Sequence, residues 1–196
     1  MSPAESSKPE HGQRSAARIR ELDPLAEHEI NLVAQRMRDT LVEVEGPDVG
    51  AALYSMDWLR ERVKWHLNPQ TALAKVFLAV QGDGKVIGHT IVRRELDAQG
   101  SPYGLFSTTY VVPAARRAGV AHQLLVTGEH WMLDQGFSSA ATWTSVTNTK
   151  LLSLYHGHGY AKVAQHIHEV TGTVMVKLEK LFSTAISLAR RLDTEY

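Results

Sequence analysis

The chain has 196 residues, with 21 basic and 21 acidic side chains, so its formal net charge is zero at neutral pH. This balance argues against a strongly basic nucleic-acid-binding surface and against a polyacidic tail. The sequence contains no cysteine, which excludes a disulfide framework, a zinc finger and a thiol nucleophile. No apolar run approaches the roughly 20 residues needed to span a bilayer, and we expect a cytoplasmic protein.

Composition and apolar spacing divide the chain into three segments. Residues 1–14 are rich in Ser, Pro, Glu and Lys and poor in apolar residues, which predicts a disordered leader. Residues 15–182 carry helical and strand-like apolar periods without a separating linker, which predicts a single domain. We expect a C-terminal helix or tail over residues 183–196.

The apolar periods predict the element order β-α-α-β-β-β-α-β-α-β-β. Helices are predicted over 24–42, about 52–67, 120–135 and 148–156, and strands over 17–22, 76–80, 85–93, 105–112, 138–146, 160–170 and 173–179. The strand-helix-strand unit within 105–146 predicts a parallel pair with a right-handed crossover. The other strands read as hairpins, so we expect an α/β (α+β) fold with a mixed sheet.

The segment from Tyr110 to Ala121 has the features of a pyrophosphate site. A strand ends, two arginines follow, and Gly119 precedes a helix whose first N–H groups and positive dipole end attract anions. Gly119 allows the backbone to approach phosphate oxygens closely, and Arg116 and Arg117 can add charge-assisted contacts. From this segment alone, a basic turn before an ordinary surface helix remains open.

A second segment, from Asn148 to Tyr160, narrows the interpretation. Together the two segments resemble the GNAT acetyltransferase superfamily over about residues 17–180. The family's acetyl-CoA motif, Gln/Arg-x-x-Gly-x-Gly/Ala, is matched by Arg116, Gly119 and Ala121, and its later signature is matched by Asn148, Tyr155, Gly159 and Tyr160. The resemblance implies a GNAT fold: a mixed, mostly antiparallel sheet of six to seven strands, with helices on both faces and a splayed central parallel pair.

The resemblance also implies a cosubstrate, acetyl-CoA, lying in the gap between strands 105–112 and 138–146. The backbone around Val111 would bind the pantetheine arm, and the Val111 N–H would polarise the thioester carbonyl. Asn148 would either contact the CoA arm or stabilise the helix predicted over 148–156. The expected cofactor-binding residues are Tyr110, Val111, Val112, Arg116, Arg117, Ala118, Gly119, Val120, Ala121 and Asn148.

Two catalytic residues are expected from the same resemblance. Tyr155 would serve as general acid toward the leaving thiolate. Because a phenol has a pKa of about 10 and a thiol of about 8.5, a hydrogen bond to the developing thiolate is energetically easier than complete proton transfer. Many relatives place a basic Glu on the strand before the CoA motif, where this chain has Ser107, Thr108 and Thr109. We expect His89 to replace that base.

Other groups remain open as the base: Glu95, a water chain through Ser107 and Thr108, or a histidine of the C-terminal strands. Two His-x-His pairs, at 156–158 and 166–168, are expected to be surface histidines rather than zinc ligands, and no metal is expected. The acidic residues Glu43, Glu45, Asp48 and Asp57 form either a rim that draws a cationic amine or a solvated loop.

The expected function is N-acetyltransfer from acetyl-CoA to a primary amine of a small molecule, by direct attack in a ternary complex. Protein or peptide N-acetylation is the alternative within the same class. A chain that binds acyl-CoA as a sensor without turnover is the alternative outside it. The expected partner is therefore a small-molecule amine acceptor, with neither nucleic acid nor membrane, and a homodimer is possible by analogy with the family.

Overall fold

The computed structural model describes residues 17–183, so the predicted leader, and the predicted tail beyond Ser183, lie outside the described residues. Its helices are α1 (Glu27–Glu45), α2 (Pro47–Ala52), α3 (Met56–Leu67), η1 (Pro113–Ala115), α4 (Val120–Asp134) and α5 (Thr149–Gly157). Its strands are β1 (Arg18–Glu21), β2 (Ala74–Val80), β3 (Val86–Leu96), β4 (Pro102–Val111), β5 (Ser139–Ser145), β6 (Ala161–Ile167) and β7 (Val174–Leu181).

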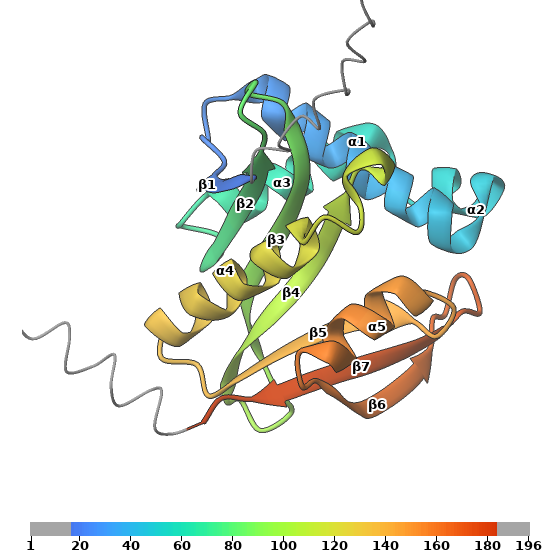
Figure 1. Ribbon diagram of the computed structural model, residues 1–196. Coiled ribbons are helices and arrows are strands. Elements are labelled where there is room, and N and C mark those ends of the chain that lie inside the picture. The colour runs from blue at the N-terminus through green and yellow to red at the C-terminus, as the bar shows by residue number, and fades with distance from the viewer. Residues whose placement is uncertain (1–16, 184–196) are drawn as a thin grey trace, which may run out of the picture.

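Within residues 17–183 the seven strands form one sheet in the order β1-β2-β3-β4-β5-β7-β6. The β4–β5 pair is parallel, and the other neighbouring pairs are antiparallel. The α4 crossover joins the two parallel strands, as the sequence predicted. The mixed, mostly antiparallel α/β fold with helices on both faces is thereby confirmed (Figure 1).

The first helical region differs from its prediction. The helix expected over 24–42 begins at Glu27 and continues to Glu45. The helix expected over about 52–67 begins only at Met56, as α3, and the short helix α2 before it was not expected. Ser55 has an extended backbone and accepts a hydrogen bond from the Trp58 N–H, so it caps the start of α3. Pro47 occupies the first turn of α2, where a missing N–H costs nothing.

Two apolar clusters hold the helices on the sheet. One joins α4 and α5 to one face through buried side chains that include Phe106, Leu124, Met132 and Tyr155. The other joins α1 and α3 to the opposite face through Ile30, Val33, Leu59, Val63 and Ile91. Figure 1 shows this division, with α4 and α5 on one side of the sheet and α1 and α3 on the other.

The central parallel pair separates after three rungs. Its paired register runs only from Gly104 opposite Ala140 to Phe106 opposite Thr142. Ser107 is the extra residue of a bulge against β3, immediately beyond the last rung. From there β4 and β5 diverge, as Figure 1 shows, so one edge of β4 faces the gap between the strands.

None of the helices within 17–183 combines the length and the apolar character required to cross a membrane.

Candidate functional site

A cavity of about 860 Å³ lies at the end of β4 where the two strands have separated. Four elements supply its walls: the end of β4, the turn before α4, the start of α5 and the last turns of α1. The lining residues include Thr40, Glu43, Thr109, Tyr110, Val111, Arg116, Arg117, Gly119, Val120, Ala121, His122, Asn148 and Lys150.

The edge of β4 presents backbone groups to this cavity. Val112 donates its N–H to the Ile87 carbonyl of β3 at 2.9 Å. Since successive residues of a strand direct their N–H groups to opposite sides, the Val111 N–H points away from β3, toward the gap. The Val111 carbonyl accepts a hydrogen bond from Arg116 Nε at 2.9 Å. The β4 edge can therefore offer a backbone donor to a ligand in the gap.

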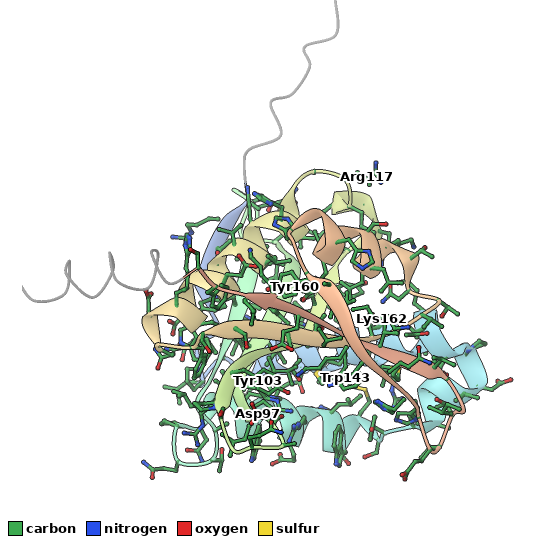
Figure 2. All side chains as sticks on the ribbon, turned by 90° about the horizontal axis from the view of Figure 1, so that it is seen from below. Asp97, Tyr103, Arg117, Trp143, Tyr160 and Lys162 are labelled. Carbon is green, nitrogen blue, oxygen red and sulfur yellow. The ribbon has the colours of Figure 1, made fainter. Side chains whose placement is uncertain are left out.

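The turn before α4 forms the second wall. Gly119 is the N-cap of α4 in a left-handed conformation, with φ of 78°, and has no side chain to cap the first N–H groups. Arg117 also has a positive φ, 65°, which is unusual for a residue with a side chain. Figure 2 shows Arg117 at the margin of the molecule, on this turn. The backbone is thus folded sharply, with helix donors available to an anion.

Arg116 is held by protein groups rather than left free. Its two terminal nitrogens donate to the two carboxylate oxygens of Glu43 on α1, at 3.0 and 2.8 Å. Lys150 of α5 reaches the same carboxylate at 2.9 Å. The hydrogen bonds from Arg116 and Lys150 lower the pKa of Glu43 to about 2. Glu43 thus joins α1 to both other helical walls of the cavity.

The acidic residues at the end of α1 therefore have protein partners. Besides Glu43, Glu45 accepts a hydrogen bond from the hydroxyl of Thr173, in the β6–β7 turn. The end of α1 consequently contacts the turn before α4, the start of α5 and the β6–β7 turn. Glu43 and Glu45 are therefore hydrogen-bonded to protein groups rather than free in a solvated loop.

Asn148 and Tyr155 lie at the start and end of α5. The Asn148 side chain accepts a hydrogen bond from the Leu151 N–H at 3.3 Å, so it caps the helix. Tyr155 is 1% exposed, and its ring packs edge-on against Phe106. Its hydroxyl has hydrogen-bonding partners in Thr109 of β4 and Thr142 of β5, and burial raises the pKa of Tyr155 well above its ordinary value. The phenol therefore lies between the separating strands.

His89 occupies a different environment. It is fully buried on β3, stacks on Tyr110 with ring centroids 6.0 Å apart, and does not line the cavity. Burial, and secondarily the nearby Arg36, lowers its pKa to about 3. Neither ring nitrogen has a hydrogen-bond partner among the described residues. The structure therefore places His89 beside Tyr110, one of the predicted site residues, but outside the cavity that most of the others line.

Most predicted cofactor residues do come together. Val112, Ala118 and Tyr155 are not in the cavity lining, although each adjoins a residue that is. Glu95, an alternative base, forms an ion pair with Arg93. Within residues 17–183, no group of three His, Cys, Asp or Glu side chains is placed to hold a metal ion. His158 instead contacts His122, with ring nitrogens 3.0 Å apart.

Sequence reasoning missed Thr40 and Lys150, and it named Glu43 only as part of an acidic rim or a solvated loop, not as a partner of Arg116. Thr40 and Glu43 line the cavity from α1, although they precede Arg116 by more than 70 residues and no motif links them. Lys150 also lines it, two residues after Asn148 in the second motif. A cation at that position was a signal available in the sequence.

Known proteins resemble this chain in sequence and in structure. The model of the acetyltransferase (GNAT) family matches residues 37–160. Aminoglycoside N(6')-acetyltransferase type 1 of Klebsiella aerogenes is 34% identical over 95 residues. That match covers 47% of this chain and 62% of the relative, less than two thirds of its length.

Two solved structures share the fold at low sequence identity. The NatC complex bound to Gag peptide and CoA contains a chain with a TM-score of 0.69 at 18% identity, covering 86% of this chain and 99% of that one. The yncA protein of Salmonella typhimurium, with its cofactor acetyl-CoA, has a TM-score of 0.66 at 15% identity, covering 87% and 96%. The family match spans the α1 wall, β4, the turn before α4 and α5. The chain therefore belongs to the GNAT family of acetyltransferases.

Proposed function

We propose that this acetyltransferase transfers the acetyl group of acetyl-CoA to a primary amine of a small molecule. The observation that carries the proposal is the cavity itself, where a free β4 edge meets the uncapped start of α4. A backbone edge suits the amide-containing pantetheine arm, and a helix N-terminus suits a pyrophosphate. The residues present therefore fit CoA.

The acceptor class rests on a different observation. Over the matched 95 residues the chain resembles an enzyme named for acetylating aminoglycosides, which are small-molecule amines. The structural neighbours include a peptide-bound complex, but its 18% identity supports only the fold. The small-molecule acceptor is thus the better supported choice.

The mechanism follows from the residues around the gap. The thioester supplies the acetyl group, and the Val111 N–H, directed away from β3, is placed to polarise its carbonyl. Tyr155 keeps its proton because its pKa is raised, so it acts as a neutral hydrogen-bond donor to the departing sulfur. Transfer of that proton to a thiolate, whose conjugate acid has a pKa of about 8.5, would run uphill.

The amine attacks directly, because the sequence has no cysteine for a covalent acyl intermediate. An alkyl ammonium has a pKa of about 10, so it must first lose a proton. We assign this step to a water chain through Ser107 and Thr108 that passes the proton to bulk solvent, since Ser107 is exposed at the bulge where β4 leaves β5. His89 is buried and Glu95 is paired with Arg93, so neither is our choice for the base.

Calorimetric titration with acetyl-CoA and with CoA tests the cosubstrate, and release of CoA thiol from a panel of amines tests the acceptor. We expect micromolar binding and turnover with at least one small amine. Turnover only with peptides would favour the peptide alternative, and binding without any turnover would favour an acyl-CoA sensor. The absence of binding would refute the proposal.

A further inference from the structure

Two cations from different walls of the cavity share one carboxylate. Arg116 lies in the turn before α4, Lys150 lies on α5, and both contact Glu43 at distances between 2.8 and 3.0 Å. All three residues line the cavity. A negatively charged side chain is therefore built into the rim of a site whose proposed ligand is itself polyanionic.

The two cations are held to different degrees. Arg116 has a second anchor, because its Nε donates to the Val111 carbonyl. Lys150 has the flexible stem of a lysine, and its side chain is 72% exposed. Exposed ion pairs contribute only about 0–1 kcal/mol, so separating Lys150 from Glu43 costs little. Lys150 is therefore the cation that can change partners.

Glu43 stays charged while this happens. The hydrogen bond from Arg116, the largest cause of the lowered pKa of Glu43, remains when Lys150 moves away and keeps the carboxylate ionised at neutral pH. Phosphate groups prefer the same lysine and arginine donors as a carboxylate does. A phosphate near Lys150 is consequently attracted by the Lys150 ammonium and repelled by the Glu43 carboxylate beside it.

We propose that Glu43 competes with the phosphate groups of CoA for Lys150, and so weakens CoA binding and speeds its release. The inference rests on the proposed function and names Lys150 as a phosphate ligand. Arg116 stays with Glu43 and Val111, and holds α1 against the turn before α4. Release of product limits the turnover of many enzymes, so faster release of CoA would raise kcat where that step is rate-limiting.

The opposite role for Glu43 is to position Arg116 for a phosphate, and the two roles differ in sign. A positioning group would strengthen CoA binding, whereas a competitor weakens it. The geometry favours competition, because the Val111 carbonyl already orients Arg116 and both terminal nitrogens face Glu43. Removing the charge of Glu43 therefore decides between them.

The experiment is calorimetric titration of the full chain with CoA and with dephospho-CoA. Glu43→Gln preserves the shape of the side chain and a hydrogen-bond acceptor for Arg116. We expect it to bind CoA roughly 3- to 10-fold more tightly than wild type. Lys150→Gln is expected to bind CoA more weakly by a similar factor, and in the double variant the gain from Glu43→Gln should shrink.

The control is Lys162→Gln. Lys162 is an exposed residue of β6 that contacts Gln165, and Figure 2 shows it well separated from Arg117. Its substitution should leave CoA affinity unchanged. If dephospho-CoA shows the same effects as CoA, Lys150 binds the pyrophosphate; if the effects vanish, it binds the 3'-phosphate. Thermal unfolding verifies that each variant is folded.

Equal or weaker CoA binding by folded Glu43→Gln refutes the competition. Unchanged binding by Lys150→Gln refutes it independently, even if Glu43→Gln fails to fold. Both results are distinguishable from failure of the proposed function, since wild type would still bind acetyl-CoA. A wild type that binds neither ligand refutes the proposed function and this inference together.

Discussion

Thr142 donates its hydroxyl to the carbonyl oxygen of Phe106 at 3.1 Å, on the last paired rung of β4 and β5. Thr142 is 3% exposed, so its loss leaves that carbonyl with one partner fewer in a buried site. We expect Thr142→Val to lower the free energy of unfolding by about 1–2 kcal/mol. Urea unfolding of the variant and of wild type measures this difference in the free energy of unfolding.

The matched control is Thr142→Ser, which keeps the hydroxyl and loses only a methyl group. The Thr142 hydroxyl is also a partner of Tyr155, so Thr142→Val should reduce kcat while Thr142→Ser retains most of it. Equal loss of kcat in both variants would show that packing, rather than the hydroxyl, matters at this rung.

Tyr155→Phe removes the hydrogen-bond donor proposed for the sulfur. We expect kcat to fall by about 10- to 100-fold, while the KM for acetyl-CoA changes little, because the interaction strengthens as charge develops in the transition state. Steady-state kinetics with the best amine measures both parameters. A Tyr155→Phe variant with wild-type kcat would contradict the assignment.

Tyr160→Phe provides the comparison for a buried tyrosine. The Tyr160 hydroxyl donates to Glu129 at 2.9 Å, and Lys180 contacts the same carboxylate. We expect this variant to lose about 1–3 kcal/mol of stability, as is typical of hydrogen bonds to charged groups, with kcat near that of wild type. A large loss of kcat is therefore the signature that separates Tyr155 from Tyr160.

The two motifs were readable because each lies in one short stretch of chain. Arg116 and Gly119 lie in the turn before α4 and Ala121 lies in its first turn, and Asn148 caps the helix that contains Tyr155. The strand-helix-strand pattern around them also predicted the parallel pair, since a crossover helix leaves few alternatives. Local patterns thus gave the fold class and the walls of the cavity that β4, α4 and α5 supply.

Other features depend on contacts between distant segments. The Glu43–Arg116 pair joins residues 73 positions apart, and no local pattern marks it. The burial of His89 also depends on α1 packing over β3, so an apparently available histidine is a neutral interior residue. The start of α3 at Met56, rather than near residue 52, rests on the Ser55 cap, which the apolar period does not mark.

Gly119→Ala tests the turn before α4. Gly119 has a left-handed φ and no atom within 4 Å of an added Cβ, so the substitution strains the backbone without a protein clash. We expect a stability loss of about 1–2 kcal/mol and clearly weaker acetyl-CoA binding, since the strained turn must still meet the phosphates. Calorimetric titration and thermal unfolding measure the two effects.

Gly84→Ala is its matched control. Gly84 lies in the β2–β3 turn, with φ of 85° and likewise nothing within 4 Å of an added Cβ. Its substitution should cost similar stability and leave acetyl-CoA affinity unchanged. If both variants bind acetyl-CoA like wild type, the turn at Gly119 does not contact the cosubstrate.

Acid sensitivity should follow from two buried histidines. Burial lowers the pKa of His89 to about 3 and that of His66 to about 4, below the ordinary value of 6.5. Above pH 6.5 both are neutral in the folded and unfolded states. As the pH falls below 6.5 these histidines become protonated in the unfolded chain but stay neutral in the folded chain. The free energy of unfolding therefore falls, by about 2 kcal/mol per histidine at pH 5.

His89→Leu should remove its share of this loss, because leucine fills the buried site without a titrating group and neither His89 nitrogen has a hydrogen-bond partner among the described residues. Urea unfolding at pH 7 and pH 5 compares the variant with wild type, and His28→Gln, at an exposed position, serves as control. The same variant tests catalysis.

If His89 were the base, His89→Leu would abolish turnover. Because His89 is buried and neutral, we expect the variant to keep its kcat/KM. That kcat/KM should rise with pH toward the pKa of the amine.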